Sequence, residues 1–237
     1  MIDEISSERI AQRLESAYCH WDLHRAAVQA QPEVKSTPPR AFSIAISREA
    51  GTHGSAVAEE VGRRLNWQVY DHQLLDAVAK DIGVRTKLLE SIDEKHTSWL
   101  LENFKRAFAV PLVSEPGYVH HFARTMLALS VHGECVIVGR GAAQILPAAN
   151  TVRVRLMAPL QDRIAVIARE RGKRPEEAKE FVATADQDHI AFIRDNFQKD
   201  PTEPHEYDQI LNTARFSVTQ CAGLIIQGLH DLQSNIA

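Results

Sequence analysis

The stretch from Ala41 to Ala58 constrains the fold more than any other part of the chain. It begins as an apolar run, passes through a turn that contains Gly51 and Gly54, and continues as an amphipathic helix. This order is typical of a buried parallel strand that leads through a phosphate-binding loop into a helix, where backbone N–H groups and the positive end of the helix dipole face an anion. A purely structural turn has the same pattern, so both interpretations stay open at this point.

The loop lacks the cation of the common phosphate-loop pattern. In G-x-x-x-x-G-K-[ST], a lysine follows the second glycine and serves the outer phosphates. Whether His53 or Gly54 takes the place of that glycine, no lysine follows, and none occurs between Lys35 and Lys80. Arg48 and His53 are the nearest cations, so phosphate binding here would depend on the backbone and on them.

Short apolar runs alternate with helical patterns along the chain. The expected strands are 42–47, 68–70, 135–138, 152–157 and 209–211. Apolar residues at helical spacing predict helices that include 57–65, 99–108, 118–129 and 160–167. A last helix is expected after Ser217, which forms a capping-box pattern with Gln220. This alternation predicts an α/β fold whose mostly parallel sheet is covered by helices on both faces.

The chain before this core is expected to be an appendage. Residues 6–30 have apolar side chains at roughly helical spacing, and the segment after them ends in tandem prolines, which cannot continue a helix. We therefore expect an N-terminal helix and a proline-rich linker over residues 1–39. A single domain would then cover residues 40–237.

The segment from about 158 to 204 is rich in arginine and keeps a helical apolar stripe. Two helices joined near Gly172–Pro175 fit this pattern, and a charged helical hairpin between two strands predicts a mobile lid. Arginines in a lid suit phosphoryl transfer, because negative charge spreads over the transferring oxygens. A solvated helical face, neutralised by its own glutamates, is the alternative.

Two of the expected strands end in candidate ligand-binding residues. The strand at 135–138 leads into Gly139-Arg140-Gly141, and ligands of open α/β sheets bind outside the carboxyl ends of the strands. The Arg140 guanidinium suits bidentate capture of a phosphate, and a surface arginine between flexible glycines is the alternative. Asp71 follows the strand at 68–70 and is predicted either to bind substrate or to cap the next helix.

Bulk properties argue against several function classes. The net charge of −4 does not favour a protein that coats nucleic acid. The three cysteines are far apart, the histidines show no zinc-ligand spacing, and no signal peptide or membrane-spanning run is evident. We expect a cytoplasmic protein with no metal cage, no membrane contact and no nucleic-acid partner.

Three stretches together carry a resemblance to a known family. They are Ile46–Glu49 with the glycine loop and Leu65–Asp71 after it, Val136–Ala142, and Tyr207–Thr213. In their order and spacing the chain resembles the cytidylate kinase-like family of P-loop nucleoside monophosphate kinases, over roughly residues 42–226. The loop of that family is itself of the Ser-Arg-Glu type and lacks the usual lysine, so the missing lysine is expected.

The resemblance implies a P-loop NTPase-type sheet of five parallel strands with a nucleotide on the Gly51–Ser55 loop. It places Arg140 near the acceptor phosphate and Arg163 at the base of the lid, near the donor nucleotide. The chain departs from the family at His53, where relatives have glycine, and at Gly141, where bona fide cytidylate kinases have aspartate.

A third departure lies in the lid. The family has an aspartate followed three residues later by an arginine, and this chain has Asp186 and His189. A histidine is mostly neutral at pH 7, so a positive charge of the family is missing here. Arg194, in the next turn, is the candidate replacement.

The leading hypothesis is transfer of the γ-phosphoryl group of ATP, with Mg²⁺, to a nucleoside monophosphate, with CMP as the first candidate. The Ser55 hydroxyl is the candidate Mg²⁺ contact. The assigned cofactor-binding residues are Ser47, Gly51, Thr52, His53, Gly54 and Ser55. The assigned catalytic residues are Arg48, Arg140, Arg163, Arg169 and Arg194, and the assigned substrate-binding residues are Asp71 and Arg140.

Two other hypotheses stay open. The absence of three groups, namely the loop lysine, the acid after Arg140 and the arginine at position 189, fits a nucleotide-binding regulatory protein that has lost turnover. In that case residues 6–30, with Tyr18 and Trp21 exposed, would form a homodimer or partner contact. The other is a kinase for a different small molecule, because a fold does not determine a substrate.

Overall fold

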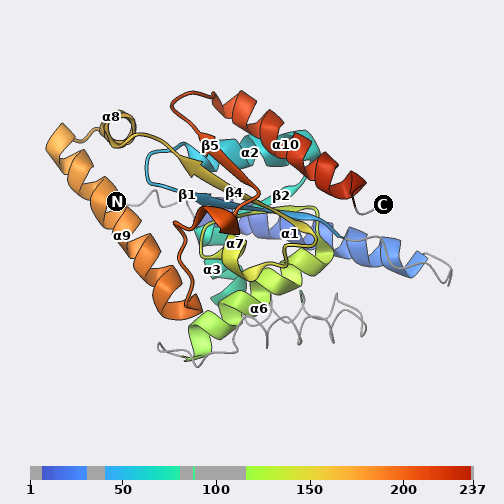
Figure 1. Ribbon diagram of the computed structural model, residues 1–237. Coiled ribbons are helices and arrows are strands. Elements are labelled where there is room, and N and C mark those ends of the chain that lie inside the picture. The colour runs from blue at the N-terminus through green and yellow to red at the C-terminus, as the bar shows by residue number, and fades with distance from the viewer. Residues whose placement is uncertain (1–6, 31–40, 81–87, 89–115, 236–237) are drawn as a thin grey trace.

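The computed structural model describes residues 7–30, 41–80, 88 and 116–235 (Figure 1). These residues contain one five-stranded sheet in the order β2-β3-β1-β4-β5, and every neighbouring pair is parallel. The strands are β1 (Ser43–Arg48), β2 (Gln68–Tyr70), β3 (Cys135–Val138), β4 (Thr151–Met157) and β5 (Gln209–Asn212). The predicted parallel sheet is confirmed, and each predicted strand end lies within one residue of the observed one.

Helices cover both faces of this sheet, as predicted (Figure 1). One face carries α2 (Gly54–Leu65) and α10 (Val218–Ser234). The other face carries α1 (Ser7–Ala30), α3 (His72–Lys80), α6 (Pro116–His132) and the short α7 (Ala142–Ile145). Between β4 and β5 the chain forms α8 (Leu160–Arg171), α9 (Pro175–Phe197) and a 3₁₀ turn (Pro204–Glu206). The linker expected before residue 40 and the helix expected at 99–108 lie outside the described residues.

Alternation along the central strands explains the two layers of core. In β1, Ile44 and Ile46 pack against α2 and α10, whereas Ala45 packs on the opposite face with α3 and α6. Successive side chains of a strand point to opposite faces, so a strand covered on both sides needs apolar residues for both faces. That requirement produces the apolar runs in the sequence. The parallel pairing of β1 with β3 brings the carboxyl ends of both strands to one shared edge.

The helix α1 is part of the core, which corrects one expectation. Trp21 is 0 % exposed, and its Nε1 donates a hydrogen bond to Oη of Tyr70 in β2 (3.1 Å). Tyr18 is partly buried and contacts Trp21 edge to face. The expectation that these two aromatic residues are exposed for a partner is therefore wrong, because β2 and α3 already cover them. A partner contact through other parts of residues 6–30 stays a prediction.

The pair α8 and α9 forms the predicted helical hairpin. Its helices are joined at Gly172–Arg174 and share a small cluster made by Ile164, Ile167, Ala178 and Val182. The far end of α9 is different, because Ile193 and Phe197 belong to the main core. The hairpin is thus fixed to the sheet domain at the end of α9.

Candidate functional site

The turn from β1 into α2 presents a row of backbone amides without acceptors. The amides of Glu49 and Ala50 donate to Leu156 O (3.1 Å) and to Oδ1 of Asp186 (2.9 Å). In the described part of the chain, the amides of residues 51–56 have no hydrogen-bond acceptor, and intrahelical bonding begins only with Val57. Six free N–H groups at a helix N-terminus are donors of the kind that bind anions.

The side chains of the loop turn away from these amides. Thr52 is buried and donates its hydroxyl to Glu49 O (2.8 Å), and Nδ1 of His53 lies 3.0 Å from Oε1 of Glu170 on α8. The imidazole of His53 therefore contacts α8 of the hairpin and leaves the backbone amides of the loop uncovered. Ser55 is exposed at the start of α2. Ser47 lies beneath the loop, and its buried Oγ has no partner among the described residues.

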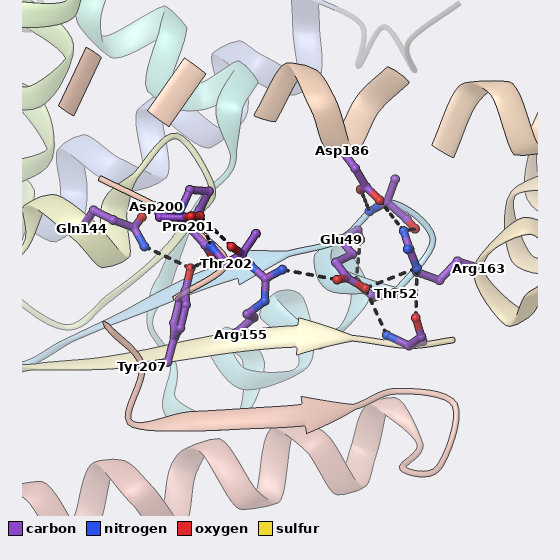
Figure 2. A network of polar contacts seen from close by, with 12 residues as sticks. Glu49, Thr52, Gln144, Arg155, Arg163, Asp186, Asp200, Pro201, Thr202 and Tyr207 are labelled. Atoms are coloured by element: carbon purple, nitrogen blue, oxygen red, sulfur yellow. Dashed lines mark hydrogen bonds and ion pairs between the residues drawn. The ribbon is translucent and has the colours of Figure 1, made fainter. Parts of the chain in front are cut away.

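A network of ion pairs supports the loop from the side of β4 (Figure 2). Glu49 accepts from Arg155 (Nη2–Oε1, 3.3 Å) and lies 3.3 Å from Nε of Arg163 through its other oxygen. Arg163 also donates to Ala158 O (3.0 Å), to Ala50 O (3.4 Å) and to the Asp186 carboxylate. Each of these charges is paired, so Arg163 connects the loop, β4 and the hairpin.

Gly51 lies against this network. Its φ is +84°, and a Cβ built on it would lie 2.6 Å from the backbone oxygen of Arg163. A side chain is therefore excluded both by the left-handed conformation and by the contact. Glycine at this position lets the loop lie directly on the first turn of α8.

Arg48, the last residue of β1, has no such partner. It is half-buried, and no acceptor among the described residues bonds or pairs with its guanidinium, which passes closely over Gly139. Burial lowers the pKa of Arg48, and repulsion by Arg140 lowers it further, against a smaller opposing effect of Asp71. An unpaired, partly desolvated cation beside free amides favours an anion as its partner.

Arg140 is held in place mainly by rings. It has φ +52° within the Gly139-Arg140-Gly141 turn, a conformation that few non-glycine residues adopt. Its guanidinium carbon lies 5.1 Å from the ring centre of Phe192 on α9 and 6.0 Å from that of Phe122 on α6. The nearest carboxylate oxygen is that of Asp76, at 3.7 Å. Arg140 is therefore positioned while its hydrogen-bonding groups stay largely free.

The glycine at 141 has a structural cause. Its φ is +79°, and a Cβ there would lie 2.7 Å from Cε2 of Phe197 at the end of α9. The aromatic ring occupies the place that an aspartate side chain would need. The missing acid and the inward-facing Phe197 are thus two parts of one local arrangement.

The hairpin presents Asp186 and His189 to the site, whereas Arg194 lies elsewhere. Residues three apart share a helix face, and residue 194 is rotated about 140° from residue 189 at 100° per residue. Arg194 is exposed and pairs with Asp200 (2.8 Å). Arg169 is exposed on α8. The roles of Arg169 and Arg194 stay predictions, and in this arrangement neither lies with Arg48.

Asp71 makes two structural contacts. Its Oδ1 accepts the amide of Leu74 (2.9 Å), which is helix capping of α3, and its Oδ2 pairs with Arg13 of α1 (2.7 Å). The capping interpretation of the sequence is confirmed. Its assignment to substrate stays a prediction.

Several residues of the site were missed by sequence reasoning. Glu49 and Arg155 anchor the loop, and Phe122, Phe192 and Phe197 shape the surroundings of Arg140 and Gly141. Arg153 and Arg155 alternate with valines in β4, and this pattern in the sequence could have identified Arg155. Among the described residues, no group of three or more side chains could hold a metal ion, and no helix has the length and apolar character needed to cross a membrane.

Several solved structures are similar to this chain. A crystal structure of an uncharacterized protein from Eubacterium ventriosum ATCC 27560 shares 24% identity at a TM-score of 0.63, covering 81% of this chain and 99% of that one. Shikimate kinase from Bacteroides thetaiotaomicron matches at 16% identity and TM-score 0.43 (81% and 98% covered). A gluconokinase from Sinorhizobium meliloti 1021 matches at 16% and 0.42 (83% and 96% covered).

The family comparison is the most informative. No curated protein matches the chain. The model of the cytidylate kinase-like family matches residues 43–215, which is more than half of the chain and includes the loop, the Gly-Arg-Gly turn and the hairpin. The chain therefore belongs to the cytidylate kinase-like family.

Proposed function

We propose that the protein transfers the γ-phosphoryl group of ATP to a nucleoside monophosphate, with CMP as the first acceptor to test. One observation carries the proposal: the unpaired Arg48, whose side chain packs on Gly54, lies beside the free amides of residues 51–56 in a member of a kinase-like family. Phosphoryl transfer depends on positioning and charge stabilisation, and it requires no nucleophilic side chain.

The residues present fit the donor nucleotide and its metal ion. The amides of residues 51–56 would bind the donor phosphates, and Arg48 would bind their free oxygens. The exposed Ser55 hydroxyl would be one ligand of Mg²⁺, which commonly binds one or two protein groups and the substrate phosphates. The metal ion would neutralise developing charge on the phosphates.

On the acceptor side, Arg140 would bind the phosphate of the nucleoside monophosphate. Its planar guanidinium, held against Phe192 and Phe122, presents a preorganised fork for two phosphate oxygens. Arg163 would have an indirect role, because it is saturated by Glu49, Ala50, Ala158 and Asp186 and holds the loop in shape.

The test is ADP release from ATP–Mg²⁺ with CMP, dCMP, UMP, AMP and GMP supplied singly, against a blank without acceptor. We expect acceptor-dependent turnover with one of them. Replacing Arg140 by alanine should raise the acceptor KM or lower kcat at least about tenfold, through loss of a charge-assisted contact. Arg63→Ala, on the exposed end of α2, is the matched control and should leave both constants unchanged.

Two outcomes would redirect the proposal. Binding of ATP without turnover for any acceptor would favour the regulatory nucleotide-binding protein, with the departures at His53, Gly141 and His189 as its losses. Turnover with a small molecule other than a nucleotide would keep the kinase and replace the acceptor.

A further inference from the structure

His189 is a histidine within a group of charges of mostly one sign. It projects from α9 toward the site, and charged groups from four places act on it: Arg48 of β1, Arg155 of β4, Arg140 of the Gly-Arg-Gly turn and Asp186 of its own helix. Arg155 is paired with Glu49, whereas Arg48 has no carboxylate partner in the described residues. The ligand-free surroundings of His189 are therefore dominated by uncompensated positive charge.

The imidazole also has an unsatisfied nitrogen. Nε2 of His189 is buried, and no hydrogen-bond partner lies near it among the described residues. A buried polar atom without a partner costs about 1–3 kcal/mol, so a change that supplies a partner to Nε2 is favoured. Asp186, one turn earlier on the same face of α9, is a carboxylate that a protonated imidazole could use.

We infer that His189 couples anion binding to proton uptake: it is uncharged in the ligand-free protein and takes one proton from solvent when a phosphoanion binds beside Arg48 and Arg140. The inference rests on the proposed function, because the anion it requires is the phosphate chain of the nucleotide. His189 is therefore a positioning residue. Its imidazole is a cation in the complex and is uncharged when the site is empty.

The electrostatics support both states. Burial, together with repulsion by Arg48 and Arg155, lowers the pKa of His189 to about 4. A bound polyphosphate would neutralise the arginines and bring several negative charges to the same place. An opposite charge within about 4–6 Å changes a pKa by roughly 1–3 units, here upward because the charged form of histidine is favoured.

The sign of the coupling follows from linkage. When the pKa of His189 is higher in the complex than in the free protein, extra binding free energy is present below the pKa of the complex. It is lost as the pH rises through that pKa. We therefore expect ATP to bind more tightly at pH 6 than at pH 8, and the difference attributable to His189 to be up to about tenfold for each pH unit of the window.

The experiment observes the imidazole directly. The full chain is labelled with ¹³C-histidine, and each ring signal is followed by NMR from pH 5 to 8 without and with saturating ATP–Mg²⁺. The ring signal of His189 is the one that is missing from the spectrum of the His189→Asn variant. The control is His205→Asn, which removes an exposed histidine of the 3₁₀ turn before β5. We expect His189 to stay neutral over this range in the free protein and to titrate near about pH 6 in the complex.

The outcomes separate the two claims. A free-state midpoint near 6.5, or a His189 signal that does not change when ATP binds, would overturn the inference and leave the proposed function standing. ATP that moves no histidine ring signal at all would overturn both. When the affinity for ATP is measured at several pH values, the His189→Asn variant should lack the pH dependence assigned to His189 and should still bind ATP at pH 8. The His205→Asn variant should keep that pH dependence.

Discussion

Two groups of arginines border the β1–α2 loop, and they differ in how their charge is balanced. Arg155 and Arg163, on the side of β4, are bonded to Glu49, Asp186 and backbone carbonyls (Figure 2). Arg48 and Arg140, on the side of β3, repel one another, and among the described residues the one carboxylate within ion-pair distance of either is that of Asp76, 3.7 Å from Arg140. The first pair of arginines is thus bonded to groups of the protein itself. The second pair lacks such partners and would gain them from a bound anion.

This difference assigns distinct roles to residues of the same type. A paired and buried arginine stabilises the scaffold, because removing it leaves its partners uncompensated. An unpaired arginine costs stability in the free protein and is retained where an anion completes it. The predictions below test this division, from the largest expected effect to the smallest.

The largest effect is expected for Arg163→Met. The side chain is 10% exposed, and the change leaves Glu49 and Asp186 without their shared cation. We expect the free energy of unfolding to fall by about 3–5 kcal/mol, measured by urea denaturation. Arg63→Met, which removes an exposed i,i+3 pair with Glu60, is the control and should cost less than about 1 kcal/mol. Equal losses of stability in the two variants would contradict the division between paired and unpaired arginines.

Gly141→Asp restores the residue that the family resemblance leads one to expect, and it should destabilise the protein. The left-handed backbone costs about 1–2 kcal/mol, and overlap with the Phe197 ring adds about 1–3 kcal/mol. Thermal denaturation of Gly141→Asp, Phe197→Leu and the double variant forms a double-mutant cycle. We expect the double variant to recover part of the loss. Strictly additive effects would show that the ring and residue 141 do not compete for space.

Arg48→Met should raise stability, opposite in sign to Arg163→Met. Burial and the repulsion from Arg140 both act against its charge, so an apolar side chain of similar length relieves that cost. We expect a gain of about 1 kcal/mol, which corresponds to a rise in Tm of about 2–4 °C for a chain of this size. A fall in Tm in the ligand-free protein would mean that Arg48 has a stabilising partner.

The smallest effect is expected for Phe192→Leu. The change keeps apolar bulk and removes the ring on which the Arg140 guanidinium lies, a contact worth about 0.5–1 kcal/mol. The acceptor KM should rise about two- to fivefold while kcat is retained. An unchanged KM would show that the Gly-Arg-Gly turn positions Arg140 without the ring.

The sheet was predictable because its determinants are local. β3 is apolar throughout and β1 has a central apolar run from Ile44 to Ile46, and glycine or polar residues mark where each strand ends. The loop and Arg140 could be found for the same reason, since parallel strands place their carboxyl ends along one edge. The capping-box pattern at Ser217 likewise depends on residues three apart, and α10 begins there.

The balance of charge in the site could not be predicted in this way. Asp186 is separated from Ala50 by 136 residues, and Arg155 from Glu49 by 106, so no local pattern shows that they bond. Trp21 was placed on the surface because its partner Tyr70 belongs to a strand 49 residues away. Which arginine is paired and which is free emerges only when these distant segments meet.

The most direct test of the division is the affinity of ATP–Mg²⁺ for three proteins, measured by calorimetry: the wild type, Arg48→Met and the control Arg63→Met. Loss of a charge-assisted contact to phosphate corresponds to about 1.5–3 kcal/mol, so Arg48→Met should bind roughly 10- to 150-fold more weakly, with a Tm no lower than that of the wild type. Arg63→Met should bind as the wild type does. Equal affinity of Arg48→Met and wild type would contradict the assignment of the free arginine to the nucleotide.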